Sequence, residues 1–214
     1  MSKLQTTKLE KASPRATYQD VLDAPPNMVA EIVDGVLYTH SRPAATHSIA
    51  VSGLGMLIGP PFHFGNGGPG GWWILHEPEL HFGDDVVVPD IAGWRRERMP
   101  EMPNEAYFTL APDWVCEVLS PSTRKLDLGG KRVVYTRARI DYLWFVDPDA
   151  RTLEACRLRG AEWMLIDRLY EDAPVSLPPF EAIRFSLADL WPPRAVHKDT
   201  PNLTTEPEPM ISMK

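Results

Sequence analysis

The sequence has little of what marks a secreted or membrane protein. Its only two cysteines, Cys116 and Cys156, each lie in an apolar run, and two cysteines cannot form the disulfide framework of a small secreted domain. No apolar run approaches the roughly 18–20 residues that a helix needs to cross a bilayer. Residues 1–15 are polar and lack the apolar segment of a signal peptide. We therefore expect a cytoplasmic protein with no membrane partner.

Cations are also in the minority, with 22 lysine and arginine residues against 29 aspartate and glutamate residues, a formal net charge of −7. Such a chain is not expected to coat nucleic acid nonspecifically. Between residues 124 and 139, however, the sequence has six cationic residues and one anionic residue. Because exposed charges act over only about 10 Å at ordinary salt, this strip can meet a polyanion locally. A solvated basic helix face explains the pattern as well, so charge alone leaves both interpretations open.

Prolines are numerous: 22 of them divide the 214 residues into short elements. Hydrophobic residues make up 43% and charged residues 24% of the chain, as in an ordinary globular domain with a sizeable core. We expect one domain over residues 17–191, preceded by a flexible arm at residues 1–16. Residues 192–214 are rich in proline and have no aromatic residue, which predicts a disordered tail.

Local patterns predict a mixture of helices and strands. Thr17 and Asp20 have the spacing of a capping box for a short helix, and Asp34-Gly35 is typical of a tight hairpin turn. Further helices are expected at 46–58 and 123–139, a loop at 59–71, and strands at 29–33, 36–40, 72–82, 85–94, 113–119, 142–146, 152–158 and 163–170. This order predicts an α/β or α+β fold with a mixed central sheet flanked by helices.

Three positions are candidates for chemistry. Asp90 follows the run Val86-Val87-Val88-Pro89. Because proline interrupts the hydrogen bonds of a sheet, this acid should lie at a strand end. Glu117 lies inside an apolar run at residues 114–119, where an unpaired carboxylate would be costly to bury. Lys131 follows Asp127 by four residues and shares its helix face.

Each position also has a structural interpretation. An acid at a strand end is commonly a turn cap, Glu117 would be solvated on an edge strand, and a lone lysine usually lies at the surface. Together, however, two strand-borne acids and a lysine form the set that metal-dependent phosphodiester hydrolysis requires. Carboxylate oxygens are ligands that Mg²⁺ prefers. The cation polarises the phosphate, and the lysine positions water or neutralises the developing charge.

These residues also belong to longer motifs. Pro89-Asp90 is followed by Glu117-Val118-Leu119-Ser120-Pro121-Ser122-Thr123, then by Asp127, Lys131 and Tyr135, and then by the run at residues 142–148. With Glu31-Ile32-Val33-Asp34-Gly35 and His47 upstream, the chain resembles the Uma-two family of restriction endonuclease-like proteins, in the PD-(D/E)XK nuclease superfamily. The resemblance covers residues 17–191.

The resemblance implies a restriction-endonuclease-like core, a mixed four-stranded sheet flanked by helices. Asp90 and Glu117 would lie on adjacent strands as catalytic metal ligands. The superfamily motif has its lysine two residues after the second acid, where this chain has Leu119. Relatives in the family resemble it in that departure and carry a lysine on the next helix instead. Lys131 matches the position of that catalytic lysine, and Lys125 is the second candidate for the role.

The same resemblance makes Glu31 an accessory acid and His47 a contact close to the site, although His47 could equally cap its helix. Arg124, Lys125 and Arg132 of the basic strip are candidates for binding nucleic acid. We therefore expect an endonuclease that hydrolyses DNA with Mg²⁺ or Mn²⁺; a homodimer is suggested by analogy alone. The alternative is an inactive nuclease fold that binds nucleic acid or a protein, which Leu119 and the net negative charge favour.

Overall fold

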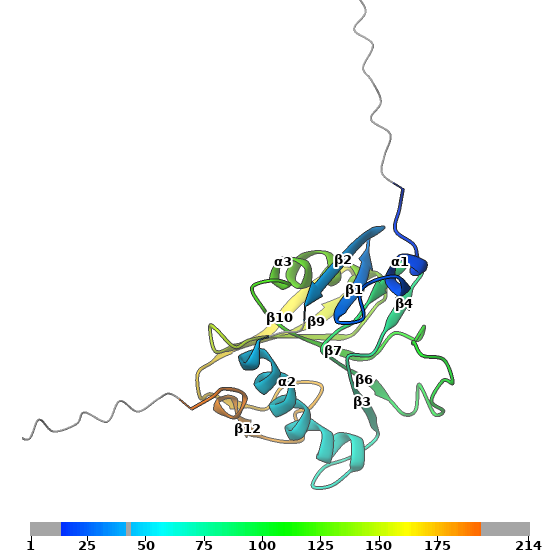
Figure 1. Ribbon diagram of the computed structural model, residues 1–214. Helices are drawn as coiled ribbons and strands as arrows, with labels where there is room; N and C mark the ends of the chain where they lie inside the picture. Colours follow the sequence, from blue (N-terminus) through cyan, green and yellow to red (C-terminus); the bar gives the residue numbers. More distant parts are fainter. Residues whose placement is uncertain (1–13, 42–43, 194–214) are drawn as a thin grey trace, which may run out of the picture.

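The computed structural model describes residues 14–41 and 44–193 (Figure 1). The expectations of a flexible arm and a disordered tail fall largely on residues 1–13 and 194–214, which lie outside the described residues. The elements are, in chain order, α1 (Tyr18–Leu22), β1 (Met28–Val33), β2 (Val36–Ser41), α2 (Ala45–Ile58), η1 (Gly59–Phe64), β3 (Trp72–His76), β4 (Leu80–Phe82), β5 (Asp85–Val87), β6 (Ile91–Arg95), β7 (Trp114–Val118), α3 (Arg124–Leu126), η2 (Asp127–Lys131), α4 (Arg132–Arg137), β8 (Tyr142–Asp147), β9 (Thr152–Arg159), β10 (Glu162–Tyr170), β11 (Pro174–Val175), β12 (Phe185–Ser186) and η3 (Leu187–Leu190).

The central sheet has six strands in the order β10-β9-β8-β7-β6-β3. Only β7 and β8 pair in parallel, through the helical crossover at residues 124–137 that joins them; the other neighbours are antiparallel. The run at residues 114–118 is therefore a central strand, as its apolar sequence predicts. The predicted α+β class with a mixed central sheet is confirmed, and the sheet has two strands more than the four that the family resemblance implies.

A second sheet has four antiparallel strands in the order β2-β1-β5-β4. Its β1–β2 hairpin turns at Asp34-Gly35, where both residues have positive φ, 53° and 77°, as a two-residue hairpin turn requires. The predicted capping box is also present, because the Thr17 N–H donates to Asp20 Oδ2 at 2.7 Å. A small third sheet pairs β11 with β12.

One long hairpin is shared between the two larger sheets, which corrects the prediction of two continuous strands at 72–82 and 85–94. Its base, β3 with β6, belongs to the central sheet, and its tip, β4 with β5, belongs to the four-stranded sheet. The chain bends at Glu77, with φ of +47°, and opposite it at residues 88–90. Pro89 has no N–H to continue the ladder, so the break leaves Asp90 where the two sheets meet.

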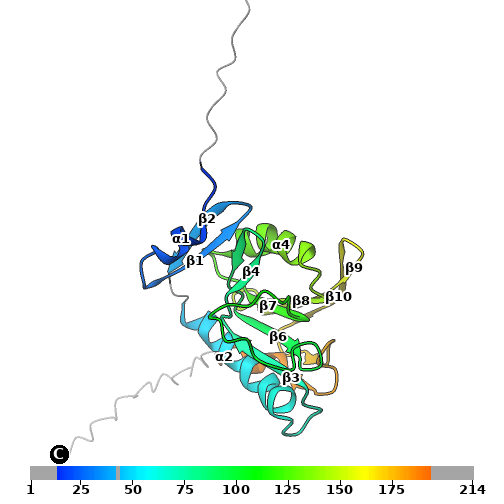
Figure 2. The same cartoon turned by 90° about the vertical axis from the view of Figure 1, so that its right-hand side faces the viewer.

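Helices cover both faces of the central sheet (Figure 2). Alternation along β7 sends Cys116 and Val118 into the cluster that contains Leu54 of α2, and Val115 into the cluster that contains Val134 and Tyr135 of α4. Glu117 has the parity of Val115, so it lies on the α4 side. None of the described helices combines the length and apolarity needed to cross a bilayer.

Two helical regions differ from the prediction. Residues 59–64, predicted as a loop, form a π-helical turn, η1, that continues α2 and ends at Gly65 with φ of +76°. Pro60 and Pro61 have no N–H to continue the hydrogen-bond ladder of α2, and it is at these residues that the α-helix gives way to the π-helical turn. The predicted helix at 123–139 is present as α3, η2 and α4. Its middle turn, η2, is π-helical, a local irregularity that is frequent at functional sites.

The two glycines of η2 face different surroundings. A Cβ atom on Gly130 would lie 2.8 Å from Cγ1 of Val33 in β1, whereas one on Gly129 would meet nothing within 4 Å. Gly130 is therefore a position at which the backbone of the crossover helix closely approaches the four-stranded sheet. This close approach brings β1 next to η2, and both elements carry polar residues of the site described below.

We expect Gly130→Ala to destabilise the protein by about 1–3 kcal/mol, because the added methyl group overpacks the contact with Val33. Gly129→Ala is the matched control and should stabilise by about 0.5–1 kcal/mol through helix propensity. Urea unfolding monitored by circular dichroism measures both. Equal effects of the two substitutions would contradict the close approach.

Candidate active site

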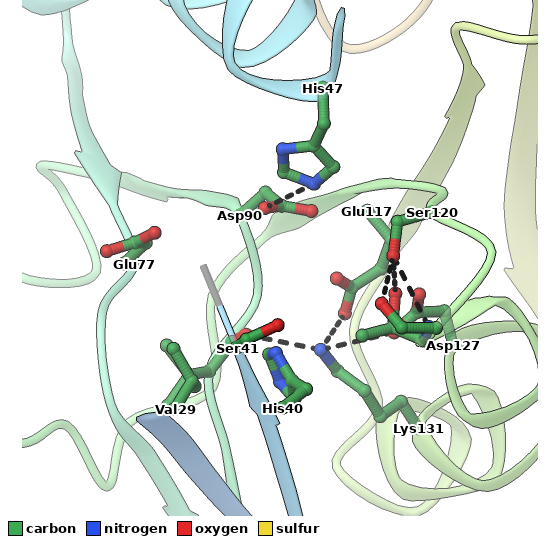
Figure 3. A pocket seen from close by; sticks show the side chains of 13 residues that line it. Val29, His40, Ser41, His47, Glu77, Asp90, Glu117, Ser120, Asp127 and Lys131 are labelled. Atoms are coloured by element: carbon green, nitrogen blue, oxygen red, sulfur yellow. Dashed lines mark hydrogen bonds and ion pairs between the residues drawn. The ribbon is translucent and has the colours of Figure 1, made fainter. Parts of the chain in front are cut away.

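The polar residues of the site come from three elements and from the break between β5 and β6, and they meet where the two sheets join; Figure 3 shows all of them except Glu31. β1 carries Glu31, the break before β6 carries Asp90, β7 carries Glu117, and η2 carries Asp127 and Lys131. Asp127 and Lys131 are the two buried residues of η2. Asp90, Glu117, Asp127 and Lys131 line one cavity, and Glu31 lies next to it through its contact with Lys131.

Lys131 is at the centre of this group and is only 2% exposed. Its Nζ lies 2.8 Å from Glu117 Oε1, 3.0 Å from Glu31 Oε1 and 3.5 Å from Asp127 Oδ1. It also donates to the carbonyl oxygen of Val88 at 3.2 Å. An ammonium has three protons, so the surrounding oxygens use all of its hydrogen-bonding capacity. Burial alone would lower the pKa of Lys131, but the carboxylates, Glu117 first, raise it well above its usual value.

Glu117 has hydrogen-bond partners at one of its two carboxylate oxygens. Oε1 accepts hydrogen bonds from Lys131 and from the hydroxyl group of the fully buried Tyr135. Figure 3 shows the second oxygen directed toward the side of the cavity where Asp90 lies. Burial raises the pKa of Glu117 well above its usual value; Lys131 opposes this shift, and the charges of Asp127, Asp90 and Glu31 add to it.

Glu31 is completely buried and uses both oxygens. Oε1 accepts from the backbone N–H of Val88 at 2.7 Å and from Lys131, and Oε2 lies 3.1 Å from Nε2 of His40. Burial would raise the pKa of Glu31, but Lys131, His40 and the Val88 N–H together lower it. Glu31 is therefore the ionised partner of Lys131, and the structure gives it a direct contact with the site.

Asp90 and His47 form the other wall of the cavity. Asp90 Oδ2 accepts from the Val118 N–H of the neighbouring strand at 2.7 Å, and Oδ1 lies 3.1 Å from His47 Nε2. His47 is 7% exposed, and its Nδ1 atom has no hydrogen-bond partner among the residues that the structure describes. Burial opposes protonation of His47, but the contact with Asp90 outweighs it and raises the pKa. His47 therefore orients Asp90 rather than capping α2, where Ala44 is the cap residue.

The cavity has a volume of about 40 Å³, and a water molecule needs about 10–15 Å³ by this measure. It can hold a small ion with a few water molecules, but a nucleotide must bind outside it. His40, Ser41, Glu77 and the hydroxyl-bearing loop at residues 120–123 complete its lining. In that loop the Ser120 hydroxyl lies 2.9 Å from those of both Ser122 and Thr123.

The structure thus brings together the predicted residues Asp90, Glu117, Lys131, Glu31 and His47. Lys125 is exposed and is not among the residues that line the cavity, so geometry favours Lys131. Sequence reasoning gave no role to Asp127, Tyr135 or His40. The hairpin register was a usable signal for His40: Asp34-Gly35 pairs Glu31 with Tyr38, which places His40 diagonally beside Glu31.

The basic residues predicted to bind nucleic acid do not line the cavity either. Arg124 lies 2.5 Å from Asp147 Oδ2, although half of its side chain is exposed. Asp147 also accepts the N–H groups of Asp149 and Ala150, so Arg124 fixes the turn after β8. Lys125 is exposed, and the carbonyl group of Arg132 accepts a hydrogen bond from the Trp163 indole at 3.4 Å.

The donor set fits a small divalent cation. Three carboxylates, those of Glu31, Glu117 and Asp127, surround the Lys131 ammonium, and the Asp90 carboxylate lines the same cavity. The cavity therefore has an excess of negative charge when all four acids are ionised. Within the described residues, no three His, Cys, Asp or Glu side chains form a metal-binding cluster. Mg²⁺ is commonly bound by one or two carboxylates, with water or substrate oxygens completing its coordination.

The mixed sheet with buried acids at its junction is a nuclease fold. It is similar to the crystal structure of a putative nuclease belonging to DUF820 from Anabaena variabilis ATCC 29413, with a TM-score of 0.62 and 26% identity over 82% of this chain and 97% of that chain. The sequence model of the Uma2 family, described as putative restriction endonuclease, matches residues 15–188. The chain belongs to this Uma2 (Uma-two) family. No curated protein matches it.

Membership supports nuclease function in general, with nucleic acid as the substrate class, and restriction endonuclease-like proteins generally use divalent metal ions. The predicted family is thereby confirmed. The roles of individual residues, the identity of the ion and the choice of DNA stay predictions, which the contacts described above support to different degrees.

Replacing Lys131 tests the buried charge cluster without a substrate. We expect Lys131→Met to destabilise the metal-free protein by about 3–5 kcal/mol at neutral pH, because it leaves buried carboxylates without their cation. Lys125→Met removes an exposed lysine from the same helical segment and should change stability by less than about 0.5 kcal/mol. Chemical unfolding in the presence of chelator measures both; equal stability of the two variants would contradict the arrangement.

Glu117→Gln should leave the metal-free protein at least as stable as the natural protein at neutral pH. The folded-state pKa of Glu117 is raised, so its carboxyl group costs stability increasingly as pH rises from the ordinary glutamate pKa to the raised one. The advantage of the glutamine variant should disappear as pH falls back through that range. Thermal melts from acid to neutral pH measure the difference, and a large loss of stability at neutral pH would show that Glu117 is a structural partner only.

Proposed function

We propose that this protein is a Mg²⁺-dependent endonuclease that hydrolyses phosphodiester bonds of DNA at the cavity between the two sheets. The observation that carries the proposal is the convergence of Asp90, Glu117 and Lys131 on one small polar cavity. A purely structural cluster would be expected to balance its charges, whereas this one has more carboxylates than cations. Family membership supports the same activity class.

Each residue has a role that follows from its contacts. When bound, the divalent cation supplies polarisation of the phosphate and of the attacking water. Asp90 and Glu117 would hold it through oxygen, while His47 and the Val118 N–H position Asp90, and Tyr135 positions Glu117. Lys131 lies against Glu117 and can neutralise charge that develops on the phosphate. The hydroxyl groups of the loop at residues 120–123 can donate to a phosphate at the mouth.

DNA would approach over the basic strip that follows this loop. Lys125 is exposed, and Arg124 is half exposed with several guanidinium donors beyond those used by Asp147. Phosphate contacts of this kind position a duplex without reading its sequence. With a net charge of −7, binding would depend on this local strip and would weaken as salt concentration rises.

The alternative, an inactive nuclease fold, was favoured by Leu119 and by the net negative charge. The packing of Leu119 weakens the first of these two arguments. Leu119, which stands where the superfamily has lysine, is 6% exposed and packs in the cluster that contains Val115 and Tyr135. The ammonium of Lys131 reaches Glu117 from the helix instead. This contact supports the proposal that Lys131 takes the place of the missing lysine, in which case Leu119 by itself gives no reason to expect lost activity.

We expect the purified protein to nick or linearise supercoiled plasmid with Mg²⁺ or Mn²⁺ and to stop in excess chelator. Asp90→Asn keeps the shape of the side chain but removes its charge, and it should lower the cleavage rate at least about a hundredfold. Agarose electrophoresis measures the reaction. The matched control is Asp84→Asn, an exposed acid in the turn between β4 and β5, which should cleave like the natural protein.

A second readout does not require cleavage. A cation that binds only the folded state raises the melting temperature by mass action, so Mn²⁺ should stabilise the natural protein and the Asp84→Asn variant but not Asp90→Asn. Stabilisation by metal with binding of DNA but no cleavage would establish the inactive alternative. Absence of both stabilisation and cleavage would contradict the proposed function.

A further inference from the structure

The proposed reaction releases a proton, and the charge cluster around Lys131 offers no free group to accept it. Water that attacks a phosphodiester loses a proton as its oxygen bonds to phosphorus, and a positioned base speeds such a transfer by about 10²–10⁴-fold. Burial alone would lower the pKa of Lys131, but the carboxylates around it, Glu117 first, raise it well above its usual value. Its ammonium therefore keeps its protons. Glu31 and Asp127 lie against this ammonium, and Asp90 and Glu117 are the proposed metal ligands.

Two histidines line the cavity, on opposite sides of it in Figure 3. His47 contacts Asp90 through Nε2, and its Nδ1 is buried. His40 stands on β2 with 21% of its side chain exposed, and its Nε2 lies 3.1 Å from Glu31 Oε2. Its Nδ1 has no hydrogen-bond partner among the described residues and is not one of their buried unpaired atoms. One nitrogen of His40 is therefore held by a carboxylate, and the other is available to a molecule in the cavity.

Glu31 determines which nitrogen of His40 carries the proton. Burial would raise the pKa of Glu31, but Lys131 and its hydrogen bonds lower it, so Glu31 is ionised. A carboxylate accepts hydrogen bonds and has none to donate. The neutral ring therefore carries its proton on Nε2, and its lone pair is on Nδ1. A buried carboxylate that holds a histidine in this way fixes the ring and stabilises the imidazolium that forms when the ring takes up a proton.

Glu77 is the other residue of the cavity wall that could accept a proton. It is exposed, and its carboxylate has no hydrogen-bond or ion-pair partner among the described residues. A base must be held within hydrogen-bond reach of the proton that it removes. Glu31 holds His40 in place, whereas none of the described residues holds the side chain of Glu77, so the geometry favours His40.

The charge of the cavity also suits a base that becomes positive. Four carboxylates and one ammonium carry three negative charges in excess when all four acids are ionised, and a bound divalent cation would offset two of them. A proton on His40 would offset the third. Lys131, on the other oxygen of Glu31, opposes this proton, but the acids outnumber the lysine.

We propose that His40 is the general base of the reaction, a role that rests on the proposed endonuclease function. Nδ1 of His40 takes a proton from the attacking water as the water oxygen bonds to phosphorus. The bond between phosphorus and the leaving sugar oxygen breaks, and that oxygen takes a proton from solvent water. His40 then releases its proton to solvent, which returns the ring to its neutral form.

His40→Gln separates a base from a structural support. The glutamine Nε2 can donate to Glu31 as the histidine Nε2 does, but an amide has no nitrogen that accepts a proton. We expect kcat for plasmid cleavage with Mg²⁺ to fall at least about a hundredfold, with little change in KM, in the melting temperature with chelator or in its rise with Mn²⁺. The matched control is His76→Gln, an exposed histidine on β3, which should cleave like the natural protein.

Imidazole provides a second test in a variant that leaves space for it. In His40→Ala, added imidazole should raise the cleavage rate severalfold, in proportion to the concentration of its neutral form, and it should leave Asp90→Asn inactive. His40→Ala also carries the test if His40→Gln does not fold, as judged by its thermal melt.

Several outcomes would overturn this role and leave the proposed function intact. They are cleavage by His40→Gln at the natural rate, a folded His40→Ala that imidazole does not rescue, and loss of cleavage in Glu77→Gln but not in His40→Gln. Loss of the Mn²⁺-induced rise in melting temperature in His40→Gln would also overturn it, because His40 would then support the metal site. If the natural protein itself does not cleave, the proposed function fails instead.

Discussion

The ammonium of Lys131 contacts both large sheets and lies on the helix between them. Glu31 belongs to the four-stranded sheet, Glu117 to the central sheet and Asp127 to the same helical segment as the lysine. Burying one cation among three carboxylates is favourable only when the geometry satisfies all of them. Three features of the fold help to meet this requirement: the bend of the shared hairpin, the π-helical turn and the contact of Gly130 with Val33. The contacts of Lys131 therefore both hold the two sheets against the helix and form the site. A substitution that removes these contacts should affect stability and the site together.

Much of the fold could be predicted because local patterns decide it. Asp34-Gly35 specifies a tight turn, Thr17 and Asp20 specify a helix start, and the apolar run at residues 114–118 specifies a central strand, all as the structure has them. The sharing of one hairpin between two sheets could not be predicted in this way. Pro89 indicated a break in the strand. Which sheet the segment before the break joins depends, however, on contacts of β5 with β1, more than fifty residues away in sequence.

The site was predicted in outline for a related reason. A carboxylate in an apolar strand signals a buried partner, and this drew attention to Glu117 from its neighbours alone. Family resemblance supplied Lys131 in place of Lys125, a choice that sequence spacing does not decide. Tyr135 and His40 were missed because each lies in an ordinary helical or strand pattern. Only the packing of α4 on β7 and the register of β1 with β2 reveal that they donate to or contact the buried acids.

The distance along the chain between the members of the charge cluster has a consequence during synthesis. Glu117, Asp127 and Lys131 lie within one β–helix crossover, but Glu31 precedes the lysine by a hundred residues. At about 5–20 residues per second, the β1–β2 hairpin leaves the ribosome roughly 5–20 s before its cation. Until then Glu31 must remain hydrated, so the hairpin cannot take its final buried position. The four-stranded sheet therefore closes over the acidic cavity late in synthesis, after Lys131 has emerged.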